Sequence, residues 1–180
     1  MQTLLIRRFA GVLAKWRRAE ASAWRRRLIC GSLVGVLLTG LPAAAKEAIY
    51  NVLDFGAGVG TFTQLAADTG ARVVAVEPEP EFAKFLREHF SGDECVQVIE
   101  GTIDEVDTHG FESVICFNVL EHVTDDRSAL GTVARLIAPG GRLFLLVAAH
   151  PRLCGGFDLG AGHLRRYSSR PLRALLTQSG

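Results

Sequence analysis

The sequence predicts an α/β fold built on a doubly wound, mostly parallel sheet. Short apolar runs alternate with helical stretches from residue 49 onward, 48% of the 180 residues are hydrophobic, and 22% are charged. Apolar strands that alternate with helices pair in parallel, and right-handed crossovers cover both faces of the sheet. We therefore expect one globular domain with a sizeable core, preceded by N-terminal helices.

The predicted strands are short apolar runs, and the predicted helices lie between them. Strands are expected at 49–54, 72–77, 95–99, 112–117 and 141–148. Helices are expected at 60–69, 79–90 and 125–138, with a short turn after the third strand and a last helix at 169–178. Pro139 and the two glycines after it should end the third helix and turn the chain into the fifth strand.

The first 45 residues differ in charge from the main domain, which we place at 46–180. Residues 1–27 carry eight basic side chains and one acidic side chain, whereas the rest of the chain carries 12 basic and 18 acidic ones. Apolar residues three or four apart in 4–28 predict an amphipathic helix that either covers the domain or lies on an anionic membrane surface. Peripheral membrane contact through residues 1–28 therefore stays open, and the acidic domain argues against a nucleic-acid partner.

Residues 28–41 form an apolar stretch that is too short and glycine-rich to span a bilayer comfortably. A packed helix is favoured there over a secretory signal. The four cysteines form no C-x-x-C pair, and Cys116 lies in an apolar run where a small core residue is expected. This pattern favours a reduced, cytoplasmic compartment.

The stretch "VLDFGAGVG" places Gly56, Gly58 and Gly60 between a strand and a helix. Glycine there permits a positive φ and lets a ligand lie on the backbone near the helix N-terminus. A dinucleotide fingerprint needs glycine at position 61, which is Thr61 here, and Asp54 is an unsuitable neighbour for a pyrophosphate. The turn therefore favours a nucleotide-like cofactor without phosphates over a nicotinamide dinucleotide.

The second strand ends at Glu77, 17 residues after Gly60. A carboxylate there can accept two hydrogen bonds from a ribose diol. The alternative is a solvated acid before Pro78 at a helix start. Together with the glycine turn, the spacing favours ribose binding.

These motifs, followed by "GTIDEV", "ICFNVLEHV" and "LIAPGGRLFLLV", resemble those of class I S-adenosylmethionine-dependent methyltransferases over residues 50–178. The resemblance implies a Rossmann-like sheet of order 3-2-1-4-5-7-6 and S-adenosyl-L-methionine as the cofactor. The cofactor contacts that it implies are Asp54, Gly56, Ala57, Gly58, Gly60, Glu77, Pro78, Thr102, Ile103, Asp104 and Asn118. The family's usual acid is absent at Thr102, so adenine would be held by the Ile103 backbone and apolar packing, or by Asp104.

A sulfonium methyl group is already activated, so the protein mainly aligns an acceptor and excludes water, while a hydroxyl acceptor also needs a base or a metal. "NVLEHV" resembles the E-x-x-E-H segment that binds a divalent ion in some ubiquinone-pathway O-methyltransferases. Glu121 and His122 match, and His163 could be the later histidine, but Asn118 replaces the first glutamate. Losing this anionic ligand weakens a metal site, so a metal is not favoured.

The catalytic candidates are His163, His122 and Glu121, with His163 as a base. "GHLRRYSSRPL" resembles a segment that lies over the acceptor pocket in related enzymes, which gives His150, Arg166 and Tyr167 as substrate-binding candidates. The alternative is a basic loop before the last helix without a catalytic part. We expect O-methylation of a small-molecule or lipid-like acceptor; the alternative is a cofactor-binding but inactive partner subunit.

The last helix ends close to Gly180, whereas the resemblance implies two further strands beyond it. Without those strands the fifth strand is an exposed edge next to the acceptor pocket. Self-association at this edge, or completion by a partner, therefore stays open.

Overall fold

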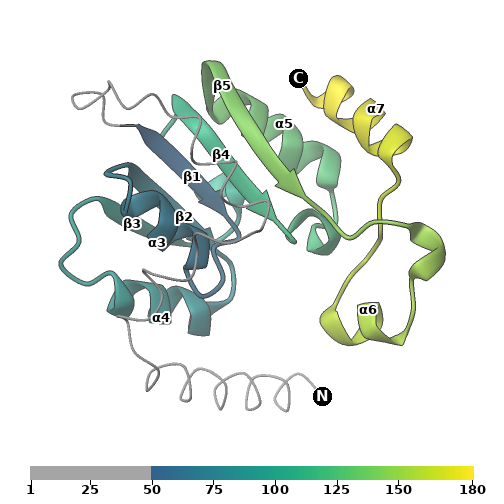
Figure 1. The fold of residues 1–180 in the computed structure, drawn as a ribbon, viewed down its shortest axis with the longest axis horizontal. Coiled ribbons are helices and arrows are strands. Elements are labelled where there is room, and N and C mark those ends of the chain that lie inside the picture. Colours follow the sequence, from purple (N-terminus) through teal and green to yellow (C-terminus); the bar gives the residue numbers. More distant parts are fainter. Residues whose placement is uncertain (1–49) are drawn as a thin grey trace, which may run out of the picture. The chain divides into compact units, whose positions relative to one another are not determined.

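The computed structural model describes residues 50–180 (Figure 1). Its five strands are β1 (Asn51–Phe55), β2 (Arg72–Glu77), β3 (Val96–Glu100), β4 (Phe111–Phe117) and β5 (Ile137–Leu146). They form one sheet of order β3-β2-β1-β4-β5, and every ladder is parallel. The predicted α/β class and the first five places of the strand order are confirmed.

The connections between the strands supply the helices. The α-helices are α3 (Thr61–Ala67), α4 (Pro80–His89), α5 (Asp126–Leu136), α6 (Gly156–Ala161) and α7 (Ser169–Ser179). Three 3₁₀ turns lie between them, η2 (Ile103–Glu105), η3 (Leu120–His122) and η4 (Pro151–Leu153).

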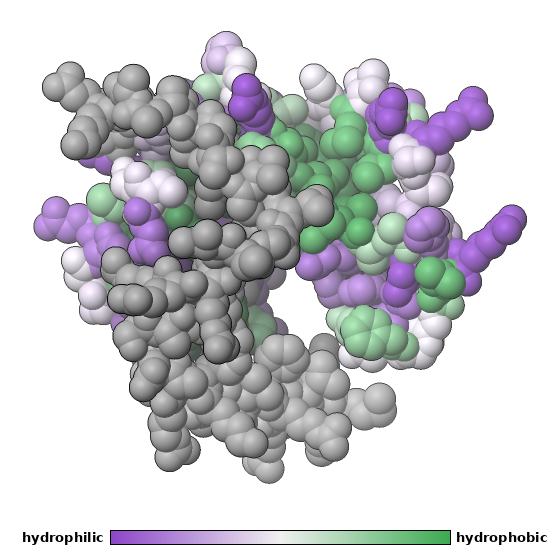
Figure 2. All heavy atoms as spheres, viewed as in Figure 1, coloured by the Kyte–Doolittle hydropathy of each residue, from purple (hydrophilic) through white to green (hydrophobic). Residues whose placement is uncertain are grey.

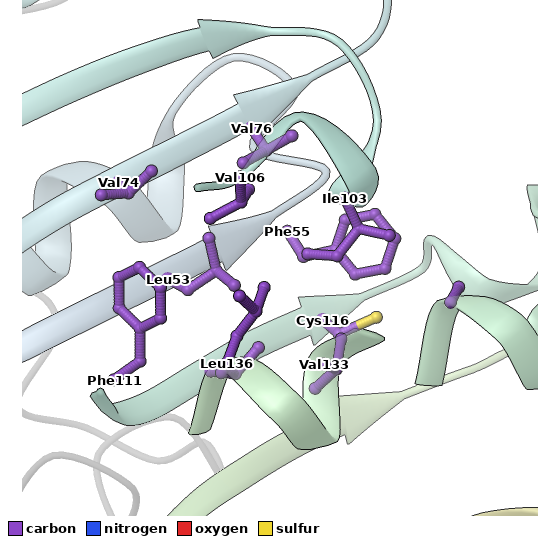
Figure 3. Packing of buried hydrophobic residues seen from close by; sticks show 12 residues of the cluster. Leu53, Phe55, Val74, Val76, Ile103, Val106, Phe111, Cys116, Val133 and Leu136 are labelled. Atoms are coloured by element: carbon purple, nitrogen blue, oxygen red, sulfur yellow. The ribbon is translucent and has the colours of Figure 1, made fainter. Parts of the chain in front are cut away.

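Alternating side chains of the strands build a core on each face of the sheet. Val52 and Val73 pack with Ala66 of α3, and Ala75 packs with Leu86 of α4. The residues next to them point the other way, into a larger cluster with α5 and η2 (Figure 3). Helices α3 and α4 therefore cover one face, and α5 covers the other.

Cys116 belongs to this larger cluster, where Figure 3 shows its sulfur among apolar side chains. The side chain is 1% exposed, and burial, with the negative charges of Glu121 and Asp54, raises the pKa of the Cys116 thiol to about 12. The thiol stays protonated at neutral pH, and the expected role of Cys116 as a small core residue is confirmed.

The start of β5 differs from the prediction. Ile137 pairs with Phe111 directly after α5, and the next pair joins Arg142 to Ser113, so residues 138–141 bulge out of the ladder. Gly140 has a φ of 81°, which shows that the expected turn lies here, inside the strand rather than before it. The strand begins early because Ile137 also packs against the core.

The segment 151–162 carried no predicted element, but it folds into η4 and α6. Its large apolar residues are mostly exposed, Phe157 by 78% and Leu159 by 79%, so no buried stripe announces a helix. The side chain of Asp158 instead accepts a hydrogen bond from the Gly155 N–H at 2.9 Å and closes the first turn of α6.

Several predictions concern residues outside the described range. The boundary between residues 45 and 46, the amphipathic helix at 4–28 and the apolar stretch at 28–41 all lie there. Within residues 50–180, every helix is too short or too polar to cross a membrane.

Candidate active site

The glycine turn joins β1 to α3 and is tied to β2. The Gly56 and Ala57 N–H groups both donate to the Val76 carbonyl oxygen, at 2.9 and 3.0 Å. Gly56, Gly58 and Gly60 have φ values of 77°, 55° and 79°, where a side chain is strained.

The three glycines have different surroundings. A Cβ on Gly56 would clash with Val119, and one on Gly60 would lie 2.7 Å from Leu86 Cδ2. A Cβ on Gly58 would meet no atom within 4 Å. Gly56 and Gly60 are therefore required by packing, whereas Gly58 leaves bare backbone open to a ligand.

Asp54 lies at the end of β1 and is only 2% exposed. Burial raises the pKa of its carboxyl to about 6; a 2.6 Å hydrogen bond from Thr63 Oγ1 opposes the rise, and the negative charge of Glu77 adds to it. A cation beside this group would favour its ionised form. Thr63 was not predicted as part of the site, and it is recognisable only from its place on the first turn of α3.

Glu77 ends β2 and faces the same turn. Its Oε2 accepts a hydrogen bond from the Gly58 N–H at 2.7 Å, and its Oε1 accepts one from the Glu79 N–H at 3.0 Å. Each oxygen keeps a second lone pair that can accept a hydrogen bond from a diol. The carboxylate is thus fixed in orientation at 6% exposure, and the exposed Pro78 follows it.

The predicted adenine region forms the η2 turn. Both the N–H and the Oγ1 of Thr102 lie 2.6 Å from Glu105 Oε2, and Asp104 Oδ1 accepts a hydrogen bond from Thr132 of α5 at 3.0 Å. The Ile103 side chain is 2% exposed and packs in the core, which leaves its backbone as the part that can face a ligand. Within residues 50–180 the Ile103 N–H has no protein acceptor.

The loop after β4 lies against the glycine turn. Asn118 is exposed, has a φ of 55°, and donates its N–H to the Leu146 carbonyl oxygen at 2.8 Å. Val119 follows it and makes the contact with Gly56 described above. Asn118, one of the predicted cofactor contacts, therefore directly precedes the residue that packs on the glycine turn.

Glu121 is fully buried in the η3 turn. Its Oε1 accepts a hydrogen bond from the Ala148 N–H at 3.1 Å, while its Oε2 has no hydrogen-bond partner among the described residues. A hydroxyl that reached this oxygen would satisfy it.

His122 and His163 lie together, with ring centroids 4.8 Å apart and an interplanar angle of 82°. His122 Nδ1 lies 3.2 Å from the Gly162 carbonyl oxygen, and His163 Nδ1 lies 2.8 Å from Asp158 Oδ1. Among residues 50–180, no group of three or more His, Cys, Asp or Glu side chains is arranged to hold a metal ion.

The substrate-binding candidates are held by the segment before α7. Tyr167 is 8% exposed, and its hydroxyl lies 3.1 Å from the Leu120 carbonyl oxygen and 2.8 Å from Asp126 Oδ2. Burial and the Asp126 hydrogen bond raise the pKa of the Tyr167 phenol. His150 is exposed and donates its N–H to the Tyr167 carbonyl oxygen at 2.9 Å, so the two candidates are linked through their backbones.

Arg166 is the third substrate-binding candidate. Its Nε donates to Asp158 Oδ1 at 2.6 Å, and a terminal nitrogen donates to the Ala149 carbonyl oxygen at 2.9 Å. Asp158 was not among the predicted site residues, although it precedes His163 by only five positions. A helical turn at 156–161 would have to be recognised first to pair the two.

The parallel sheet has an open glycine turn after β1 and a fixed carboxylate at the end of β2. This arrangement is typical of proteins that bind a nucleoside-bearing cofactor at the carboxyl edge of the sheet. Residues 53–145, just over half of the chain, match the family model of the methyltransferase domain. The chain belongs to the class I S-adenosylmethionine-dependent methyltransferases.

Curated relatives share one name. Ubiquinone biosynthesis O-methyltransferase of Xanthomonas oryzae pv. oryzae is 39% identical over 143 residues, which cover 77% of this chain and 58% of the relative. The protein of the same name from Xylella fastidiosa is 36% identical over 99 residues, 52% of this chain and 40% of the relative. The matched part of the chain thus spans little more than half of the first relative and less than half of the second.

Two solved structures with the same fold are named for nitrogen acceptors. Phosphoethanolamine N-methyltransferase 2 of Haemonchus contortus, solved with S-adenosylmethionine, matches 82% of this chain and 36% of its own at a TM-score of 0.66 and 18% identity. A 1,6-didemethyltoxoflavin-N1-methyltransferase of Burkholderia thailandensis, solved with S-adenosylhomocysteine, matches 73% of this chain and 60% of its own. The TM-score is 0.57 and the sequence identity is 24%. These likenesses show the fold and leave the acceptor open.

Proposed function

We propose that this chain binds S-adenosyl-L-methionine and catalyses transfer of its methyl group to a hydroxyl of a small-molecule or lipid-like acceptor. The observation that carries the proposal is the pair formed by Glu77 and Gly58, a carboxylate held by the N–H of an open glycine. A ribose diol on Glu77 places the rest of the cofactor over that bare backbone.

The residues around this pair fit the cofactor's other parts. Asp54 supplies a buried carboxylate for a cationic amine, and ionising it beside a cation offsets the cost of its burial. The Ile103 N–H, which has no acceptor within residues 50–180, can serve the adenine. When bound, the cofactor supplies a methyl group that is already activated for transfer.

An oxygen acceptor is favoured by both the relatives and the site. The curated relatives are named O-methyltransferases of ubiquinone biosynthesis, which pairs oxygen chemistry with a lipid-like quinone. His163 supplies a ring nitrogen that can take a proton from a hydroxyl. An amine acceptor needs no such base when it arrives unprotonated.

Methyl transfer is tested with S-adenosylmethionine labelled with ¹³C in its methyl group and two probes, a 4-alkylcatechol and an alkylamine of the same chain length. We expect label on the catechol oxygen, and a loss of at least about tenfold in rate for His163→Gln. His89→Gln, an exposed histidine on α4, is the matched control and should leave the rate unchanged.

Two outcomes would contradict the proposal. Label on the amine alone would assign a nitrogen acceptor. Cofactor binding without transfer to either probe or to a wider set of phenols would favour the inactive partner subunit.

Two contacts of the chain are further parts of this proposal. Strand β5 ends the sheet within residues 50–180. Its Leu146 is 51% exposed, and Figure 2 shows hydrophobic atoms over this strand, which supports self-association there.

Peripheral membrane contact through residues 1–28 of a cytoplasmic protein rests on the basic charge of these residues. Sedimentation of the full chain, alone and with anionic vesicles, tests both; a monomer that never sediments with vesicles would contradict both.

A further inference from the structure

Asp158 stands directly behind His163 and is only 1% exposed. Its Oδ1 accepts hydrogen bonds from Arg166 Nε at 2.6 Å and lies 2.8 Å from His163 Nδ1, while its Oδ2 accepts from the Gly155 N–H at 2.9 Å. The Arg166 hydrogen bond, with those of Gly155 and His163, outweighs burial and holds the pKa of the Asp158 carboxyl well below its usual range. The group is an anion at neutral pH.

An ionised carboxylate can only accept hydrogen bonds. The short contact with His163 Nδ1 therefore requires a proton on Nδ1, which leaves the lone pair of a neutral imidazole on Nε2. By the same reasoning, the neighbouring His122 carries a proton on Nδ1, because this nitrogen faces the Gly162 carbonyl oxygen.

The His163 ring is connected to the cofactor turn through a short series of contacts. Its side chain is 12% exposed and packs edge to face with His122. His122 lies three residues after Val119, which contacts Gly56. His163 thus packs against the end of η3, the turn that directly follows the residue in contact with Gly56.

We propose that Asp158 is a positioning residue that holds His163 in the tautomer with the proton on Nδ1, so that Nε2 accepts the proton of the acceptor hydroxyl. The inference rests on the proposed function. As the hydroxyl proton moves to Nε2, the oxygen forms a bond to the methyl carbon, and the electron pair of the breaking C–S bond stays on sulfur. The positive charge thus passes from the sulfonium to the imidazolium, next to the Asp158 carboxylate, and the imidazolium later loses its proton to water.

A purely structural role for Asp158 is the competing explanation, because the same carboxylate joins Gly155 to Arg166 and so closes the segment 155–166. Such a role predicts a loss of stability in variants but no preference between the two tautomers of His163. The tautomer is therefore the observation that separates the two explanations.

The test is ¹⁵N NMR of the full chain labelled at histidine, in which the two ring nitrogens of each tautomer have distinct shifts. We expect wild-type His163 at neutral pH with its proton on Nδ1. Asp158→Ala should move a large part of the population to the tautomer protonated on Nε2, because it removes the oxygen that holds the proton on Nδ1. Asp158→Glu, which keeps the carboxylate, should restore the wild-type tautomer at least partly.

Asp126→Ala is the matched control, because Asp126 also pairs with an arginine, Arg165, and within residues 50–180 it has no histidine partner. It should leave the His163 tautomer unchanged. A proton on Nε2 in the wild-type protein would overturn the inference even if Asp158→Ala failed to fold. So would an Asp158→Ala protein that folds and keeps the wild-type tautomer.

The consequence for transfer is measured with the 4-alkylcatechol probe. Asp158→Ala should lower kcat about 10- to 100-fold, with the KM for the probe and the affinity for S-adenosylmethionine within about threefold of wild type. Absence of cofactor binding by the wild-type chain would refute the proposed function and not the tautomer assignment. Transfer by wild type together with an unchanged kcat in Asp158→Ala would refute the positioning role alone.

Discussion

At the scale of single residues, Asp54 is kept at a cost to stability. The pKa of its carboxyl is raised from 3.8 to about 6 in the folded chain, so folding is favoured most below pH 3.8, and this advantage is lost as the pH rises through about 6. At pH 7 the folded chain therefore holds a buried charge that the unfolded chain holds in water. A cationic ligand is one reason to keep a carboxylate at such a position.

Asp54→Asn should therefore stabilise the ligand-free chain at pH 7.5 by about 1–3 kcal/mol, since a shift of roughly two pKa units corresponds to about 3 kcal/mol. The gain should vanish below about pH 4, where the wild-type group is protonated in both states. The same variant should bind S-adenosylmethionine at least about tenfold more weakly, about 1.4 kcal/mol. Urea unfolding at the two pH values and calorimetry check this; a variant that is less stable at pH 7.5 would contradict it.

Gly58 and Gly60 offer a second comparison between neighbouring residues. Gly58→Ala should lower the free energy of unfolding by only about 1 kcal/mol, the cost of a positive φ, because its Cβ meets no atom within 4 Å. It should nevertheless weaken the binding of S-adenosylmethionine strongly, because the cofactor lies on that backbone in our proposal. Gly60→Ala should cost more stability because its Cβ meets Leu86. Equal cofactor affinity of Gly58→Ala and wild type would remove this glycine from the site.

The candidate site residues that the sequence identifies are those that lie at fixed spacings along the chain. Asp54, the glycines and Glu77 are recognisable because a strand end, a turn and the next strand end have fixed spacings. Asp158 was missed because its partners are set by a loop without periodicity. The burial of Glu121 could not be foreseen either, because a 3₁₀ turn after β4 decides which way it points.

At the scale of elements, the segment between β5 and α7 is the part of the chain that tertiary contacts determine. Tyr167 fixes its end on η3 and α5 through its hydroxyl, and Ala149 and Tyr167 form an isolated parallel bridge. The strands were predicted to within a few residues because apolar runs between turns are a local signal. Helix α6 was not predicted, because its first turn depends on the hydrogen bond from the Gly155 N–H to the Asp158 side chain.

Tyr167→Phe distinguishes an anchor from an acceptor contact. If the hydroxyl mainly holds the segment, the variant should lose about 1–3 kcal/mol of stability, because the hydrogen bonds of the hydroxyl to the Leu120 carbonyl oxygen and the Asp126 carboxylate are lost. Thermal unfolding measures this, with Tyr50→Phe as the control, since within residues 50–180 the Tyr50 hydroxyl has no hydrogen-bond partner. Unchanged stability combined with a raised KM for the catechol probe would instead assign Tyr167 to substrate binding.

At the scale of the whole molecule, the parallel order β3-β2-β1-β4-β5 places the ends of β1, β2 and β4 side by side. The glycine turn, Glu77 and the loop after β4 therefore meet at one edge although they lie far apart in the sequence. This arrangement followed from the sequence because alternating strands and helices leave few topologies open. The identity of the acceptor did not, because it depends on the exposed surfaces around α6 and on residues outside the described range.

The central claim is that Glu77 and the open glycine turn hold S-adenosyl-L-methionine, and calorimetric titration of the cofactor into the full chain tests it most directly. We predict binding by wild type and a loss of about 1–3 kcal/mol, roughly 5- to 150-fold, in Glu77→Ala. Glu100→Ala is the matched control, because Glu100 pairs with Glu77 in the sheet register but is exposed and bonded to Arg87; its affinity should match wild type. Equal affinities for all three proteins, or binding of NADH in place of S-adenosylmethionine, would contradict the account.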